Sequence, residues 1–169
     1  NADKIKPHQA DVVTARNGED ALENGAFVAL GELENTDLGR DTYKIGKLAD
    51  TTVKWGMVDC VALMYDETKD ERDFILGAGE IARVRRFPAG GAMTIAKKHI
   101  AEEVVAGNLL GLKEGTYQLE KVEAKTDAVA RVLEVWKKYK SENEIACLSF
   151  SRVYPNNKKI GKEYSGTEI

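Results

Sequence analysis

The sequence predicts a mainly β protein, an antiparallel sandwich or a barrel-like fold with one or two short helices. Three features of the 169 residues point to this fold class: short apolar runs bounded by glycine, segments in which apolar and polar residues alternate, and turn-forming dipeptides between them. The length is that of a single domain able to form its own hydrophobic core.

The chain divides into three segments. Residues 1–24 are polar and show no periodicity, so we expect an extended N-terminal arm that gains order only against a partner. Residues 25–153 hold the predicted strands and form a single β-rich domain. Residues 154–169 contain few apolar side chains, and we expect them to form a C-terminal tail.

The first predicted strands follow directly after the arm. The run Ala26–Leu30 is apolar throughout and lies between two glycines, which is typical of a buried strand. Residues 43–45 alternate between apolar and polar and predict an edge strand. Residues 58–65 form a second apolar run that is rich in β-forming residues.

The middle of the chain predicts a hairpin and a helix. Residues 80–87 alternate with a period of two, which indicates a half-buried strand. Because residues 88–91 are turn formers, we expect residues 87–95 to close a hairpin with that strand. Apolar side chains of residues 96–105 can share one helical face, so this segment predicts a short helix.

The last third of the domain contains one segment with two interpretations. Residues 117–122 and 145–153 both predict strands. Residues 128–139 fit an amphipathic helix, but their three valines and Trp136 favour a strand that turns into 145–153. We favour the strand, and the helix remains the alternative.

Composition excludes several classes of function. The formal net charge of −3 leaves no basic excess for binding nucleic acid. No apolar run approaches the roughly 20 residues that span a bilayer, and the N-terminal residues have no apolar signal core, so we expect neither a membrane anchor nor secretion. Cys60 and Cys147 both lie in apolar runs, and we expect both thiols to be reduced and buried.

When the neighbouring residues are considered, no sequence motif indicates a cofactor site, a metal site or a catalytic centre. Gly77-Ala78-Gly79 lacks the third glycine of a dinucleotide loop and precedes a strand, so it predicts a turn. His99 falls near Glu102 and Glu103 on the expected helix, but a metal site needs three or four protein ligands, so we favour a solvated helix face. We therefore predict no catalytic residues, no cofactor and no metal.

The residues that we expect to contact a partner lie in two places. Arg83, Arg85 and Arg86 form a compact basic group, and the planar guanidinium suits recognition of an acidic protein surface. In the arm, aliphatic side chains are spaced to occupy apolar hollows on a partner or to add as a strand to a sheet edge. These arm residues are Ile5, Val12 and Val13.

The order of the segments resembles a known family. A polar arm leads into the apolar stretch of residues 23–33, a strand then ends in Met64-Tyr65-Asp66, and an acidic loop precedes residues 78–84. Over residues 20–153 this order is similar to that of the head-decoration and minor structural proteins of tailed bacteriophages. The resemblance implies a β-rich domain without catalytic residues that contacts the major capsid protein on the outside of the shell, often as a symmetric dimer or trimer.

The leading hypothesis is therefore a non-enzymatic virion protein, a capsid decoration or head-fibre-base subunit, made in the host bacterial cytoplasm and located on the capsid surface. It would bridge capsid subunits and stabilise the shell by mass action. A tail or head–tail connector subunit is the first alternative. A small soluble hydrolase with a carboxylate-based site is the second, because carboxylates are abundant in the chain.

Overall fold

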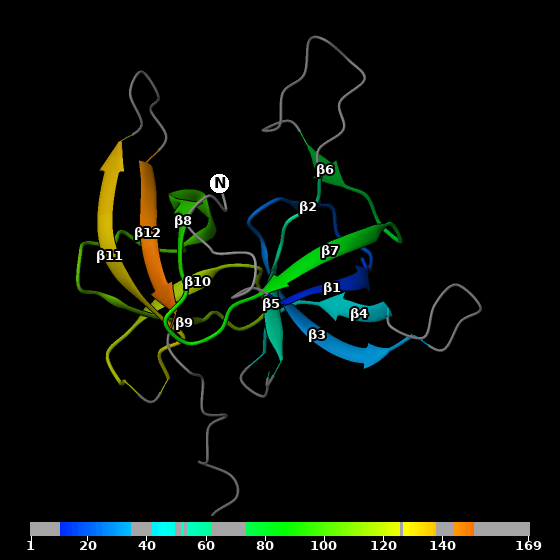
Figure 1. The fold of residues 1–169 in the computed structure, drawn as a ribbon, viewed down its shortest axis with the longest axis horizontal. Helices are drawn as coiled ribbons and strands as arrows, with labels where there is room; N and C mark the ends of the chain where they lie inside the picture. Colours follow the sequence, from blue (N-terminus) through cyan, green and yellow to red (C-terminus); the bar gives the residue numbers. More distant parts are fainter. Residues whose placement is uncertain are drawn as a thin grey trace, which may run out of the picture.

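The computed structural model describes residues 11–34, 42–49, 52, 54–61, 74–125, 127–137 and 144–150. These residues form a small closed barrel and a curved five-stranded sheet that lie side by side, together with a short two-stranded ribbon (Figure 1). The predicted mainly β, barrel-like fold is confirmed. The only helical element among the described residues is one 3₁₀ turn, Lys97–His99, and none of them forms a helix long and apolar enough to cross a membrane.

The barrel is closed by its first strand. Its five strands, in spatial order, are β1 (Asp11–Arg16), β4 (Thr42–Gly46), β3 (Phe27–Leu33), β5 (Trp55–Val58) and β7 (Ile81–Arg86). β1 pairs with β4 in parallel and with β7 in antiparallel orientation, and all other pairs are antiparallel. Closure leaves no free edge in this sheet, so every barrel strand has two hydrogen-bonded neighbours.

Small and β-branched side chains fill the barrel. One buried residue or more from each strand points inward: Ala15, Val28, Leu30, Ile45, Val58, Ala82 and Val84. The two-stranded ribbon of β2 (Leu22–Glu23) and β6 (Ile75–Leu76) adds Leu22 and Leu76 to this core. Five strands enclose little space, which is why alanine and valine rather than aromatic residues line the interior.

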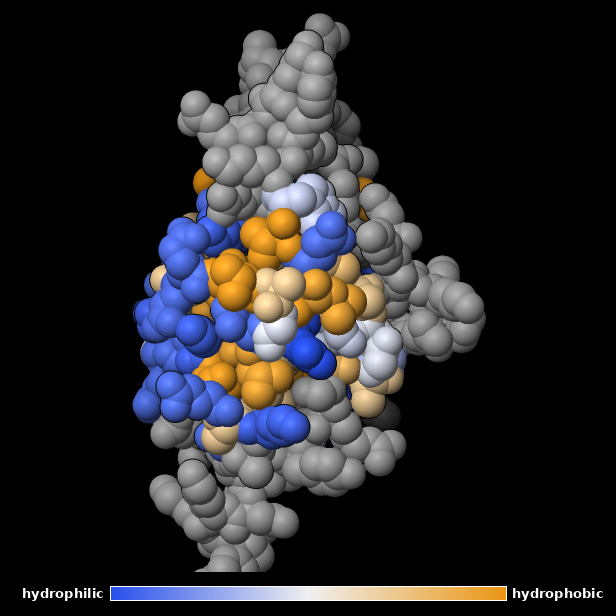
Figure 2. Space-filling model, turned by 90° about the vertical axis from the view of Figure 1, so that its left-hand side faces the viewer, coloured by the Kyte–Doolittle hydropathy of each residue, from blue (hydrophilic) through white to orange (hydrophobic). Residues whose placement is uncertain are grey.

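The second sheet is antiparallel throughout. Its strands, in spatial order, are β10 (Leu119–Val122), β9 (Leu109–Leu112), β11 (Ala130–Lys137), β12 (Glu144–Phe150) and β8 (Ala92–Ala96). A single bridge between Ile100 and Leu119 brings the segment after β8 to β10, so the sheet curls around its own inner face. Figure 2, which faces this side of the molecule, shows hydrophobic groups among hydrophilic ones, and Leu133 of β11 is 49% exposed.

Strand β3 belongs to both cores because it is buried on both faces. Val28 and Leu30 point into the barrel, whereas Phe27 and Ala29 point out of it and pack against the five-stranded sheet. Around Phe27, the rings of Trp55, Phe87 and Phe150 form an aromatic cluster, in which Phe87 stacks on Phe150 with ring centroids 4.2 Å apart. Through this cluster the two sheets share one continuous hydrophobic core.

The prediction of an arm over residues 1–24 is wrong for its second half. Residues 11–16 form β1, and Ala15 is completely buried in the barrel. The hydrogen bonds and apolar contacts that order this segment come from β4 and β7, which local sequence does not reveal. Residues 1–10 and the expected tail, 154–169, lie outside the described residues.

Three further predictions are corrected. Residues 96–105 form only the 3₁₀ turn, because the shared core buries Ile100 and Val104 in an irregular segment. The expected hairpin over 87–95 does not form, since β7 belongs to the barrel and β8 to the other sheet. Residues 43–45 are not an edge strand, because β4 pairs on both sides.

The strand predictions in the last third are confirmed. β11 pairs with β12 as expected, and the strand alternative for residues 128–139 is correct over residues 130–137, while residues 138–139 and 151–153 of the predicted strands lie outside the described residues. A bulge between Val132 and Glu134 inserts one residue, so Val132 and Val135 both face the core and Leu133 points outward. β9 was not predicted, and of the run 58–65 only Val58 lies in a strand, with residues 62–65 outside the described part of the chain.

Replacing Phe27 should weaken the junction between the sheets. Phe27→Ala removes a fully buried ring, and we expect the free energy of unfolding to fall by about 3–5 kcal/mol. Val12→Ala, in an exposed position of β1, should change it by less than about 1 kcal/mol. Chemical denaturation monitored by circular dichroism measures both, and equal effects would contradict the shared core.

Deleting residues 1–20 should open the barrel. The deletion removes β1 and leaves β4 and β7 without a common neighbour, so we expect the melting temperature to fall by at least about 10 °C. A thermal scan of the truncated and intact proteins tests this. An unchanged melting temperature would show that β1 is no part of the folded barrel.

Candidate partner-binding face

The register of the barrel brings most of the predicted contact residues together. In the antiparallel pair of β1 and β7, Val12 lies opposite Arg85, Val13 opposite Val84 and Asp11 opposite Arg86. The aliphatic pair of the supposed arm and the three arginines are thus cross-strand neighbours. Ile5, the remaining predicted contact residue, lies outside the described residues.

The alternation of the two strands decides which of these side chains reach solvent. Val13 packs against the barrel core together with Ala15, Ala82 and Val84. The intervening residues point outward and form what we call the β1–β7 face. Its members are Val12, Thr14, Arg16, Ile81, Arg83 and Arg85.

Acidic side chains engage most of the positive charge of this face. Arg85 Nε donates to Asp59 Oδ2 at 2.7 Å, and Arg16 Nε donates to Glu34 Oε2 at 2.7 Å. At the end of the strand, Arg86 Nη1 donates to Asp11 Oδ2 at 2.9 Å. Within the described part of the chain Arg83 has no ion pair, although its side chain is exposed, so it presents an uncompensated positive charge.

Exposed apolar side chains lie beside Arg83. Val12 is 41% exposed and Ile81, on the same strand as Arg83, is 49% exposed. Exposed aliphatic groups are common singly, but here they stand on two paired strands with a guanidinium that forms no ion pair with another described residue. Arginine beside apolar contact area is the composition that protein interfaces favour.

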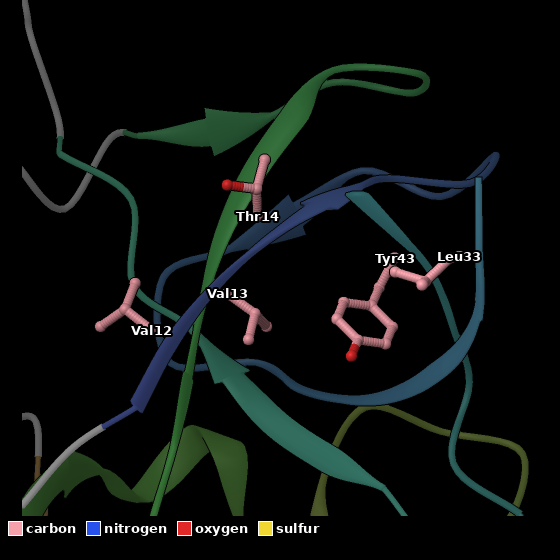
Figure 3. A pocket seen from close by; sticks show the side chains of 5 residues that line it. All are labelled: Val12, Val13, Thr14, Leu33 and Tyr43. Carbon is pink, nitrogen blue, oxygen red and sulfur yellow. The ribbon is translucent and has the colours of Figure 1, made fainter. Parts of the chain in front are cut away.

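A shallow hollow adjoins the same strand. It has a volume of about 310 Å³ and is lined by residues of three barrel strands: Val12, Val13, Thr14, Leu33 and Tyr43. Figure 3 shows the side chain of Val13 and the ring of Tyr43 reaching toward the same space, with Val12 directed away to the other side of β1. The hollow is open, and polar and apolar groups contribute to its wall about equally, so it can accept a side chain of a partner but does not enclose a small molecule.

The predicted contact residues differ in how far they reach solvent. Arg85 and Arg86 form ion pairs with aspartates, and Val13 is turned toward the core. Ile81 and Leu33, which are not among the predicted contact residues, are exposed on the same barrel. For Ile81 a signal existed, because an apolar residue stands at a position where the period of the strand requires a polar one.

The predicted turn at Gly77-Ala78-Gly79 is confirmed, since it joins β6 to β7. No cluster of three potential metal ligands occurs among the described residues. Of the two cysteines, Cys147 is buried as predicted, but Cys60 is only half-buried. The Cys60 Sγ atom accepts a hydrogen bond from the backbone N–H of Arg83 at 3.4 Å.

The expectation that His99 lies on a solvated helix face is wrong. Its side chain is only 7% exposed, and its ring packs against Gly25, where an added Cβ would lie 2.6 Å from Nε2. Gly25 also has a φ of +97°, so two independent constraints favour glycine there. Burial and the neighbouring Lys98 lower the pKa of His99 to about 4, and the nearby Glu23 and the hydrogen bond to the Asn24 backbone oppose this shift only in part.

The comparison with known proteins shows a likeness in structure. No family model matches the chain, and no curated protein matches its sequence. The barrel and the curved sheet together are a fold found in a structural protein of a virus head. The N base of the head fibre gp8.5 of bacteriophage phi29 has this fold: the alignment gives a TM-score of 0.51 at 14% identity and covers 85% of this chain and 96% of that one.

Burial of His99 predicts a pH-dependent stability. Because the pKa of His99 is about 4 in the folded protein against 6.5 for an ordinary histidine, the unfolded state binds the proton more readily. The free energy of unfolding should therefore fall as the pH is lowered from about 6.5 toward 4, by up to about 1.4 kcal/mol per pH unit.

Denaturation curves across this range, compared with those of His99→Gln, measure the contribution. The variant should be less stable at pH 7, and its stability should depend less steeply on pH between 6.5 and 4. Parallel pH profiles for the two proteins would contradict burial of a neutral imidazole.

Proposed function

We propose that this protein is a non-enzymatic structural protein of a tailed-bacteriophage head that binds the outside of the capsid, as a decoration protein or as the base of a head fibre. The observation that carries the proposal is the fold shared with the phi29 head-fibre base over most of both chains. It supports a structural role in a phage head and a location in the virion. The order of the sequence segments supports the same class independently.

The β1–β7 face is the surface that we assign to the capsid. Arg83 offers a charge that no other described residue neutralises, and Val12 and Ile81 offer apolar area beside it. An acidic patch with apolar neighbours on the major capsid protein would complement this face in both respects. Leu33 and the hollow around Tyr43 extend the contact on the other side of β1.

The rigidity of the face favours such a role. Its strands belong to a closed barrel, and ion pairs hold Arg16 and Arg85 in place, so binding orders few additional groups. A protein bound across neighbouring capsid subunits stabilises the assembled shell, because it binds the assembled state and not the separated subunits.

Reversing the charge of Arg83 should weaken attachment. We expect Arg83→Glu to lower the affinity for mature shells at least tenfold in co-sedimentation with shells that lack this protein, since a carboxylate would face the acidic patch. The matched control is Arg131→Glu, which makes the same change at an exposed arginine of the five-stranded sheet. Thermal scans should show both variants folded.

Equal binding by both variants and the wild type would show that attachment does not use the β1–β7 face. Binding lost only in Arg131→Glu would move the capsid contact to the five-stranded sheet. Absence of any binding of the wild-type protein to shells would contradict the decoration role itself.

A further inference from the structure

Among the described strands, β8 is a border strand whose outer side pairs with no other described strand over residues 92–96, although the segment directly after it meets β10 at Leu119. The barrel has no edge, and β10 at the other border of the five-stranded sheet carries Glu120 and Lys121 and meets Ile100 through the isolated bridge. Charges and partial cover of this kind are how proteins prevent edges from pairing. β8, with the sequence Ala-Met-Thr-Ile-Ala, has no charge, no proline and no bulge.

The backbone groups on the open side of β8 can be assigned from the ladder. The amide of Phe150 donates to the carbonyl of Gly91, and β8 and β12 pair without a register shift. Because hydrogen-bonded pairs alternate along an antiparallel ladder, the polar groups of Met93 and Ile95 point to β12. The N–H and C=O groups of Ala92, Thr94 and Ala96 therefore point to the open edge, and none of them bonds to another described residue.

The side chains of β8 match a second copy of the same strand. Met93 and Ile95 are buried in the shared core, and Ala92, Thr94 and Ala96 point the other way and are half-buried. The strand is nearly palindromic about Thr94. In an antiparallel pair centred there, Ala92 meets Ala96, Met93 meets Ile95 and Thr94 meets itself, so small residues oppose small ones and large apolar residues oppose large ones.

The flanking charges also fit this pairing. Lys97 follows β8 directly, and Gly91 precedes it. In the antiparallel arrangement each Lys97 lies opposite Gly91 of the other copy, which separates the two ammonium groups by the length of the strand. A parallel arrangement would set the two lysines side by side, but each is already paired with Glu103 of its own chain, so the matching of small and large side chains favours the antiparallel direction more than this charge does.

We infer that two copies of this chain associate through antiparallel pairing of their β8 strands about Thr94, which joins the two five-stranded sheets into one. The two-fold symmetric contact uses the same strand of both copies. The inference concerns the free protein and does not depend on attachment to a capsid. A dimer that does not bind shells would leave it intact while contradicting the proposed function.

A cysteine at the symmetry axis tests both the contact and its register. In Thr94→Cys the two thiols lie in directly opposed residues, whose Cα atoms are about 5.5 Å apart in a hydrogen-bonded pair, within reach of a disulfide. We expect more than half of this variant to form a covalent dimer on oxidation with glutathione disulfide. Peptide mapping should locate the bond between the two copies of residue 94.

Ala92→Cys is the matched control, because the two copies of residue 92 lie about 14 Å apart in this register and cannot be bridged. A disulfide in Ala92→Cys but not in Thr94→Cys would overturn the register. The wild-type protein, oxidised in parallel, accounts for Cys60 and Cys147.

A charge at the axis gives a second, non-covalent test. Thr94→Lys places two like charges opposite each other while its side chain points away from the core, so we expect a dimer in sedimentation of the wild type and a folded monomer for the variant. Leu133→Lys, on the outer face of the same sheet but away from the edge, should remain dimeric.

Two results would overturn the inference. If Leu133→Lys and not Thr94→Lys dissociates the dimer, the copies associate through the outer face of the sheet and not through its edge. If the wild type is a monomer at every concentration, and the amides of Ala92, Thr94 and Ala96 exchange slowly, another segment of the same chain occupies the edge.

Discussion

The double burial of β3 is the constraint on which the rest of the structure depends. A strand with one face in the barrel and the other against a second sheet must carry apolar side chains on both faces. The run Ala26–Leu30 meets this requirement. Phe27 supplies the large ring that fills the space between the sheets, while Val28 supplies the small side chain that a five-stranded barrel admits. Exchanging the two would overfill the barrel and leave a cavity at the junction.

Local patterns predicted those parts of the fold whose stability is local. Residues 81–86 and 130–137 form strands as predicted. In these segments, successive side chains point to opposite faces, so the apolar pattern alone indicates which side chains are buried. The sequence of β1 shows no such alternation, since Val12 and Val13 are adjacent, and its order comes from strands far along the chain. Residues 96–105 failed as a helix for the related reason that tertiary burial of Ile100 and His99 overrides helical propensity.

The candidate face was only half predictable for a similar reason. A cluster of arginines is visible in the sequence, but which of them is free depends on where the aspartates lie in three dimensions. Asp59 and Asp11 are remote from Arg85 and Arg86 in sequence and adjacent in space, so among the described residues Arg83 is the arginine of this group without an ion pair. The alternation of side chains along β7 is sufficient to place Ile81 on the surface. The hollow beside Tyr43 could not be predicted in this way, because it forms only when strands distant in sequence close the barrel.

Closure of the barrel by β1 has a consequence for how the chain folds. β1 is the first described strand to leave the ribosome, but one of its two neighbours, β7, comes from the middle of the chain. By contrast, β9 pairs with β10 and β11 with β12 across short connections. Contacts between distant segments carry the larger entropy of loop closure, so we expect the barrel to close more slowly than these two hairpins form. Truncated translation products that end before β7 would leave β1 and β5 unpaired on one side, and they would be the species of this protein most prone to aggregate.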